Sequence, residues 1–238
     1  MKYAIALIIG FLTGIVIFVA GFYYNPFAGQ ATVSPLVLGE QELLDLSFPA
    51  VPGEAIVFSN DGESTIAPHP EKVPQLWEPA IRNTSVFITM LDNSRGQPAG
   101  IGVKFSSDSE DTRVLNSEAL INSVWHVYLA GRGTIFVDQT ENYWSYLKDI
   151  FLPARWSSGD NWRGSWHSVM TVGPGALGTA RVTGVSGEFA GLNSEAVESL
   201  SARAYSAVEG PVAMNGALTI SLPRATANQN EQEPEDRP

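Results

Sequence analysis

The sequence predicts an all-β protein, an antiparallel β-barrel or sandwich, that follows a single N-terminal transmembrane helix. An uncharged apolar run extends from Tyr3 to Tyr24, and short apolar segments separated by turn residues follow it. The chain has 22 Gly and 15 Pro, but only 16% of its residues are charged. Many short segments bounded by Gly and Pro are typical of antiparallel sheets. We therefore expect a transmembrane anchor at 1–24, a tether at 25–53, a β-domain at 54–224 and a disordered acidic tail at 225–238.

The apolar run from Tyr3 to Tyr24 has the length of a membrane span. As a helix it would extend over roughly 33 Å, which is enough to cross the hydrocarbon core of a bilayer. A cleaved signal peptide would have a shorter apolar run and a cleavage site made of small residues. Here the run ends in Phe22-Tyr23-Tyr24-Asn25-Pro26, so an uncleaved anchor in the lipid bilayer is expected.

The charges around this run predict its orientation. Lys2 precedes the run, and the next basic residue after it is Lys72. The positive-inside rule therefore places the N-terminus in the cytoplasm and the remainder outside the inner (cytoplasmic) membrane, which is the periplasm if the host is a Gram-negative bacterium. Ala6, Gly10 and Gly14 repeat every four residues, a pattern that lets a second helix approach closely. The partner would be another membrane protein or a second copy of this chain.

The segment after the anchor is rich in proline, with Pro26, Pro35, Pro49 and Pro52. We expect a tether there, with one or two helical turns at residues 40–47. The last residues, 225–238, lack aromatic and large aliphatic side chains, so they have no means of burying apolar surface.

The central block is predicted to be made of strands. Trp125, Val127 and Leu129 alternate with His126 and Tyr128, which is typical of a strand with one buried face. Gly131-Arg132-Gly133 predicts a hairpin after it. A short helix is expected at Ser117–Ser123, and Asn193–Ser199 fits either a helix or a strand. The expected strands are Ala55–Ser59, Ser85–Leu91, Gly100–Ser106, Trp125–Leu129, Thr134–Asp138, Trp166–Val172, Gly178–Phe189, Leu200–Val208 and Ala217–Leu222.

The most distinctive run of the chain is the glycine-rich segment from Thr183 to Leu192, TGVSGEFAGL. The apolar alternation slips in phase at Gly184, as a bulge or a sharp strand bend requires. The run resembles the G-G-T/S-G-x-F-x-G pattern of the allene oxide cyclase and dirigent barrel superfamily, with Val185 in place of the second glycine. The resemblance covers about residues 120–222 and implies an eight-stranded antiparallel barrel with an apolar cavity. The active-site residues of that family have no matching positions here.

Aromatic and basic residues are concentrated between residues 144 and 166. Aromatic rings beside a guanidinium group can hold an apolar or anionic ligand, or they can form a protein-binding patch. The same side chains would equally serve to plug one end of a barrel. The candidate ligand-binding residues of this segment are Trp144, Trp156, Trp162, Arg163 and Trp166.

Two further candidates are single titratable residues. His126 lies in an alternating strand, and Glu188 lies beside the glycine bend, where a buried carboxyl group would act as an acid or a base. The three His are far apart, so no metal site is predicted, and no motif predicts a cofactor. Carboxylates such as Asp138, Glu141 and Asp149 are scattered, and nothing in the sequence selects a catalytic pair among them.

Composition excludes several classes of function. The net charge of −11 argues against a nucleic acid partner, and the absence of Cys excludes disulfides, thiolate nucleophiles and Cys-based zinc sites. The sequence favours a membrane-anchored, outward-facing β-domain that binds a hydrophobic small molecule or lipid, with isomerase-like or cyclase-like chemistry as an extension. The alternative is a non-catalytic accessory or assembly subunit of a membrane or envelope complex.

Overall fold

The computed structural model describes residues 2–23, 41–51, 55–59 and 84–223. The expected acidic tail at 225–238 and most of the expected tether, residues 25–40, lie outside these ranges. Helix α1 covers Lys2–Tyr23. It is the one described helix that is long and apolar enough to cross a membrane, over Tyr3–Gly21. A signal sequence has the same features, so the anchor expected from the sequence remains a prediction.

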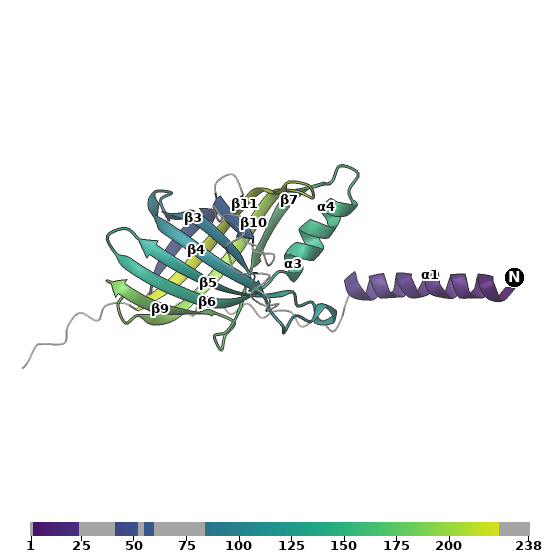
Figure 1. The fold of residues 1–238 in the computed structure, drawn as a ribbon, viewed down its shortest axis with the longest axis horizontal. Helices are drawn as coiled ribbons and strands as arrows, with labels where there is room; N and C mark the ends of the chain where they lie inside the picture. Colours follow the sequence, from purple (N-terminus) through teal and green to yellow (C-terminus); the bar gives the residue numbers. More distant parts are fainter. Residues whose placement is uncertain (1, 24–40, 52–54, 60–83, 224–238) are drawn as a thin grey trace, which may run out of the picture.

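The rest of the described chain is mostly antiparallel β-sheet (Figure 1). All nine expected strand segments are found in strands, so the β class is confirmed. The strands are β1 Gln41–Pro49, β2 Ala55–Ser59, β3 Ser85–Asn93, β4 Pro98–Asp108, β5 Leu120–Leu129, β6 Gly133–Asn142, β7 Asn161–Val169, β8 Thr171–Gly173, β9 Ala180–Gly187, β10 Asn193–Ser206 and β11 Gly210–Pro223.

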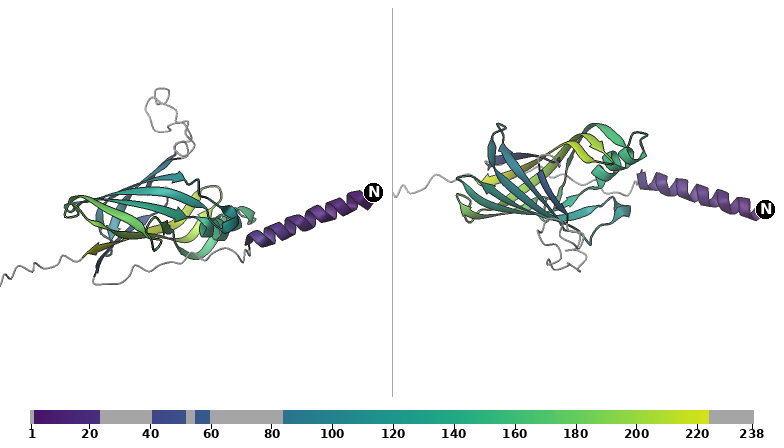
Figure 2. Two further views of the ribbon diagram at one scale, coloured as in Figure 1. Left: turned by 90° about the horizontal axis from the view of Figure 1, so that it is seen from below. Right: turned by 45° about the horizontal axis from the view of Figure 1, so that its top comes forward.

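The strands form a barrel-like ring (Figure 2). The hydrogen-bonded order among the described strands is β1-β11-β10-β9-β6-β5-β4-β3, and β1 also pairs with β3, which closes the circuit. Strand β2 pairs with the free part of β3, β7 continues along β10 beyond the end of β9, and β8 pairs with β6. All of these pairs are antiparallel.

Strand β1 corrects one local expectation. The helical turns expected at residues 40–47 are wrong, because Gln41–Pro49 runs antiparallel to β11 along its whole length. Leu46 and Phe48 point into the ring and are almost fully buried. Residues 41–49, which fall within the range expected to be a tether, therefore form the strand that closes the ring. The buried pairing with β11 outweighs the weak local preference for helix.

Two other short segments of uncertain type also turn out to be strand. The helix expected at Ser117–Ser123 is wrong: the described chain has a 3-10 turn at Val114–Asn116, and β5 begins at Leu120. Asn193–Ser199 belongs to β10. Both segments lie between partner strands, and tertiary pairing overrides local propensity there.

The glycine run contains the expected bulge. In the pairing of β6 with β9, Thr134 lies opposite Ser186 and Ile135 lies opposite Gly184, so Val185 is the extra residue. A Cβ atom on Gly184 would lie 1.7 Å from the carbonyl oxygen of Phe189, so no larger residue fits without movement of the chain. The bulge therefore needs glycine at this position because another backbone segment passes against it.

A short helical segment covers part of one end of the ring. It consists of α3 Trp144–Tyr146, a π-helical turn at Leu147–Phe151 and α4 Leu152–Trp156. Tyr146 makes edge-to-face contacts with Tyr143, Trp166 and Tyr205, at ring-centroid distances of 6.1, 6.2 and 5.8 Å. These contacts attach the segment to β7 and β10.

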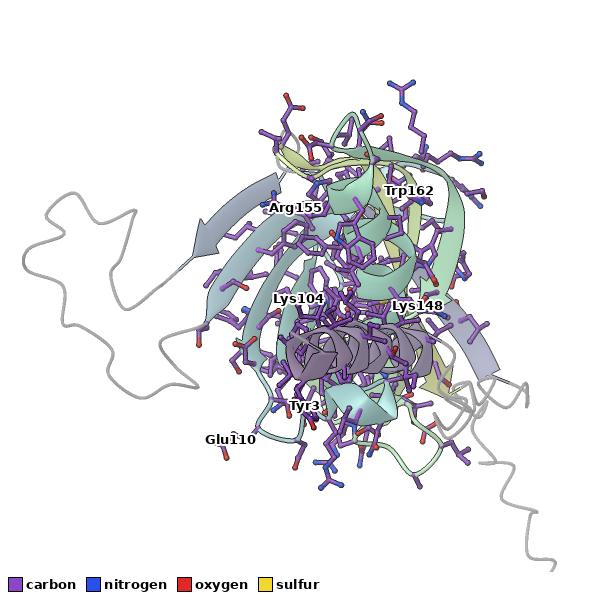
Figure 3. The ribbon with its side chains drawn as sticks, turned by 90° about the vertical axis from the view of Figure 1, so that its right-hand side faces the viewer. Tyr3, Lys104, Glu110, Lys148, Arg155 and Trp162 are labelled. Atoms are coloured by element: carbon purple, nitrogen blue, oxygen red, sulfur yellow. The ribbon has the colours of Figure 1, made fainter. Side chains whose placement is uncertain are left out.

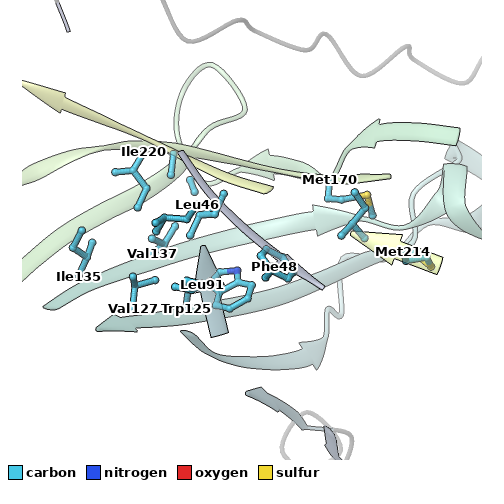
Figure 4. Close-up of a cluster of buried hydrophobic side chains, with 14 of the residues drawn as sticks. Leu46, Phe48, Leu91, Trp125, Val127, Ile135, Val137, Met170, Met214 and Ile220 are labelled. Carbon is cyan, nitrogen blue, oxygen red and sulfur yellow. The ribbon is translucent and has the colours of Figure 1, made fainter. Parts of the chain in front are cut away.

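The core lies inside the ring (Figure 4). Trp125 is fully buried, and its ring lies 4.9 Å from the ring of Phe48 and 6.1 Å from that of Phe87. The predicted inward face of β5, made of Trp125, Val127 and Leu129, is confirmed, because all three are buried. Strand β1 thus contributes core as well as hydrogen bonds.

The role of β1 is testable by truncation. A chain that starts at Gln41 keeps β1, whereas a chain that starts at Glu54 loses Leu46 and Phe48, whose burial stabilises the fold by about 1.5–3 kcal/mol each. It also leaves β11 and β3 without their partner. We expect residues 41–238 to give a β-sheet circular dichroism spectrum and cooperative unfolding, and residues 54–238 to lose both. Equal stability of the two chains would contradict the closed ring.

Candidate functional site

Three charged side chains meet inside the ring: Lys104 from β4, Glu141 from β6 and Glu198 from β10. Each is buried, with exposed fractions of 6%, 0% and 1%. Successive side chains of a strand point to opposite faces of the sheet, so Glu198 lies on the same face as Ala196 and Leu200, and Glu141 lies on the same face as Val137 and Gln139. Figure 3, viewed from the end where α4 lies, shows Lys104 in the middle of the ring.

The Lys104 ammonium group connects the two carboxylates. Its Nζ lies 2.7 Å from Oε1 of Glu141, and 2.8 and 2.9 Å from Oε1 and Oε2 of Glu198. It also lies 5.4 Å from the centroid of the Trp125 ring. An ammonium group has three protons to donate, so these contacts use its full capacity.

Neutral donors hold the carboxylates in place. The hydroxyl of Ser123 donates to Oε2 of Glu141 at 2.6 Å, and the indole N–H of Trp125 donates to Oε2 of Glu198 at 2.7 Å. The side-chain amide of Gln139 also donates to Oε2 of Glu198. Hydrogen bonds to charged acceptors are stronger than neutral ones, so this network offsets part of the cost of burial.

A second layer fixes Gln139. The hydroxyl of Thr171, on β8, donates to Oε1 of Gln139 at 2.8 Å and accepts the backbone N–H of Glu198 at 2.8 Å. The amide orientation of Gln139 is thereby set, with its N–H directed at Glu198. Five strands, β4, β5, β6, β8 and β10, therefore contribute to one polar cluster.

The cluster holds two carboxylates for one ammonium group. Burial raises the pKa of Glu141, and the charge of Glu198 raises it further, against the opposing effect of Lys104. Burial by itself would lower the pKa of Lys104, but the two carboxylates outweigh it and raise that pKa above its ordinary value of 10.5. Lys104 is therefore charged at neutral pH, and Glu141 keeps a proton at a higher pH than a solvated glutamate does.

Tyr143 extends the cluster to the surface of a cavity. Its hydroxyl donates to Oε1 of Glu141 at 3.4 Å, a long contact. Burial raises the pKa of Tyr143, and the neighbouring charge of Glu141 raises it further. The phenol therefore stays protonated at neutral pH, and its O–H remains available as a hydrogen-bond donor.

The cavity lies against this cluster and has a volume of about 420 Å³. Lys104, Glu198 and Tyr143 form the polar part of its wall, and Ser85, Ser106 and Tyr146 add hydroxyl groups. The remaining wall is apolar and comes from Phe48, Ala50, Val51, Phe87, Ile121, Leu200, Pro211 and Met214. A mostly apolar cavity with a few convergent polar groups is the usual form of a small-molecule site.

The expected aromatic candidates lie beside this cavity rather than in its wall. Trp162 and Trp166, on β7, are half-buried against the core, and the Trp166 indole N–H donates to the hydroxyl of Ser145 at 3.1 Å. Trp144 begins the helical segment, and Trp156, at its end, is 66% exposed. The polar loop expected between Trp156 and Trp166 is limited to the turn at 157–160, because β7 begins at Asn161.

The other three expected candidates point away from the ring interior. Arg163 is exposed on β7. His126 lies on the outer face of β5, with its ring 4.8 Å from the ring of Phe136. Glu188 is exposed and forms an ion pair with Arg132. The structure does not bring these three residues together, and none of them lines the cavity.

The buried cluster was missed because charge usually indicates an exposed position. Glu141 continues the inward row Ile135, Val137 and Gln139, and Glu198 lies in the buried row Ala196, Leu200 and Ala202. Glu198 is two residues before Leu200, and Glu141 is four residues after Val137, so extending each apolar alternation along its strand would have selected both carboxylates. The other carboxylates considered with Glu141, Asp138 and Asp149, are exposed.

The described residues contain no group of three or more His, Cys, Asp or Glu side chains that could hold a metal ion. The Lys104 ammonium group occupies the position between Glu141 and Glu198 that a cation would take.

Comparison with known proteins identifies no family. No protein-family model matches the chain, and the search of curated proteins finds no match. Two solved structures are similar over 83% of this chain, each with a TM-score of 0.36. One is a nonspecific heme-binding cyclase that catalyses a 4 + 2 cycloaddition in neoabyssomicin biosynthesis, at 9% identity over 74% of its length. The other is the Diels-Alderase AbmU from Streptomyces koyangensis, at 10% identity over 76% of its length.

Removal of the buried cation should be costly. We expect Lys104→Met to lower the free energy of unfolding at pH 7 by about 3–5 kcal/mol, because it leaves two buried carboxylates without a counter-charge. A carboxyl with a raised folded-state pKa stabilises the fold below its unfolded pKa, and this stability is lost as the pH rises through the folded pKa. The loss of unfolding free energy caused by Lys104→Met, measured by urea titration, should therefore be smaller at pH 4 than at pH 7.

The matched control is Lys148→Met, at a half-buried position on the helical segment. It should change the stability by less than about 0.5 kcal/mol at either pH. A Lys104→Met deficit that is the same at pH 4 and pH 7 would show that the carboxylates do not respond to the lost cation.

Proposed function

We propose that this protein binds a hydrophobic small molecule or lipid in the cavity and rearranges it by proton transfer, as an isomerase or cyclase does. The observation that carries the proposal is the position of a buried ammonium–dicarboxylate cluster at the wall of an apolar cavity. The cavity provides the affinity for an apolar ligand, and the cluster provides polar groups at one end. A proton-transfer rearrangement needs no oxidant, reductant or second substrate.

The geometry assigns a role to each polar group. Tyr143 lines the cavity and relays a proton to the ligand, and Glu141, the stronger acid of the two, supplies that proton through the hydrogen bond between the two side chains. Glu198 also lines the cavity, and it accepts the proton that leaves another position of the ligand. Lys104 is hydrogen-bonded to both carboxylates, so it stabilises the negative charge on Glu198 before the transfer and on Glu141 after it, and it relays the proton from Glu198 back to Glu141 before the next turnover. The proton that enters the ligand and the proton that leaves it balance, so the product is an isomer.

The accessory-subunit alternative has weaker support. It would be favoured by a filled interior and an exposed cluster of Trp side chains. Instead the ring has a cavity, and of the four tryptophans between residues 144 and 166 only Trp156 is strongly exposed. These observations favour the ligand-binding function.

We also propose that α1 anchors the protein in the inner membrane, with its N-terminus in the cytoplasm and the ring outside. The support is the length and composition of Tyr3–Gly21 and the position of Lys2. Gly10 and Gly14 have open space around them and line a shallow groove on the helix. Such a groove would accept a second transmembrane helix.

Ligand binding can be tested by native mass spectrometry of the full-length protein extracted gently from its own membrane. We expect a discrete small adduct that is released on denaturation. Met214→Trp should remove the adduct, because the larger side chain fills the cavity that Met214 lines. Val212→Trp is the control, since Val212 is on the same strand and 51% exposed, and it should keep the adduct. A bare chain with a stoichiometric protein partner would favour the accessory subunit instead.

The orientation can be tested with a reporter fused after Pro238. Alkaline phosphatase is active only outside the cytoplasm, and we expect activity from this fusion because the charge at Lys2 keeps the N-terminus inside. Reversal of the charge balance, by Lys2→Glu with two lysines added after residue 25, should reduce the activity. An inactive wild-type fusion would contradict the proposed orientation.

A further inference from the structure

The outer face of the sheet formed by β3, β4, β5 and β6 is unusually apolar. Its most exposed members are Met90, Ile101, Phe105, Val124, Tyr128 and Phe136, which are between 37% and 53% exposed. Cross-strand pairing makes them neighbours: Ile101 lies opposite both Met90 and Tyr128, and Phe105 lies opposite Val124. We call these six residues the outer patch.

The outer patch is continuous across the sheet. Val103 and His126 lie opposite each other in the row between the Ile101 row and the Phe105 row, and Phe136 pairs with His126 on the far side. The pleat of the sheet places alternate residues on one face, so these rows form one surface without interruption.

The patch is large enough for a protein interface. From the exposed fractions, its six side chains present on the order of 600 Å², at the upper end of what a soluble monomer usually exposes in one patch. Two such faces would together bury on the order of 1,200 Å², which exceeds the roughly 1,000 Å² that a specific interface needs.

Charge decides which occupant fits. The six residues of the outer patch are uncharged, as is Val103 between them, although the chain has a net charge of −11; Asp138, opposite Val124 at the edge of the patch, is followed across the sheet by Arg181 of β9. Most surfaces of two copies would repel each other because of this net charge, but the apolar faces of two copies can pack together without placing like charges in contact. A membrane-surface site would instead require several Lys or Arg and Trp around the apolar area, whereas the patch itself has none of these and the acidic side chain of Asp138 borders it.

We propose that the outer patch is the interface of a homodimer in which the same face of two copies packs together about a twofold axis. The axis passes near Val103 and His126, at the centre of the rows, so each of these residues lies close to the same residue of the second chain. The interface is on the outside of the ring and is independent of the cavity and of any reaction there.

The oligomeric state of the full-length protein in detergent tests this proposal, by analytical ultracentrifugation. Wild type should sediment as two chains. Ile101→Lys should give one chain, because it introduces paired charges into the interface. Val212→Lys, at a similarly exposed position on β11, should remain dimeric. A monomeric wild type, or equal behaviour of the two variants, would overturn the proposal.

Disulfide trapping gives a second measurement that does not depend on destabilising the protein. The chain contains no Cys, so a single introduced thiol reports only on its own surroundings. Under mild oxidation, His126→Cys should form a covalent dimer in most of the sample, and Val212→Cys should not. A dimer that survives Ile101→Lys but is lost in Gly10→Leu would assign self-association to α1 and overturn the proposed face.

Discussion

The buried contact of Lys104 with Glu141 and Glu198 is the constraint on which the rest of the structure depends. Removing three charges from water is costly, and the cost is offset only if every donor and acceptor finds its partner. Those partners come from five strands, and Lys104 and Glu198 are 94 residues apart in sequence. A shift of one residue in the pairing of β4, β6 or β10 would turn a charged side chain to the outside. The cluster therefore selects the native register of the ring.

The same constraint would prepare the cavity for the proposed chemistry. Hydrogen bonds from Ser123, Trp125 and Gln139 hold the carboxylates before a ligand arrives, so little reorganisation is needed on binding. Burial, together with the charge of Glu198, raises the pKa of Glu141. An apolar core of similar volume would be at least as stable. We infer that the charged cluster is kept for what it does to a ligand.

Strand β4 contributes residues both to the interior of the ring and to the outer patch. Its inward residues include Gly102 and Lys104, whereas Ile101, Val103 and Phe105 face outward. Gly102 is required because a Cβ atom there would lie 2.7 Å from the Trp125 ring. The apolar face of this strand is thus the outer one, in contrast to an ordinary half-buried strand. The inverted pattern supplies both the cation of the cluster and the centre of the outer patch.

The sequence by itself determined the apolar helix, the β class, the places of nine strand segments and the bulge at Gly184, because these depend on local composition and on a period of two. It also determined the inward face of β5, where large apolar residues alternate with polar ones. Only the tertiary structure decided which face of β4 is buried, since alternation defines two faces and pairing of Lys104 with Trp125 chooses between them. Pairing with β11 likewise made residues 41–49 a strand, and closure of the ring brought Glu141 and Glu198 to Lys104. Contacts between residues so far apart in the chain leave no local signal, because their energy exists only when the strands meet.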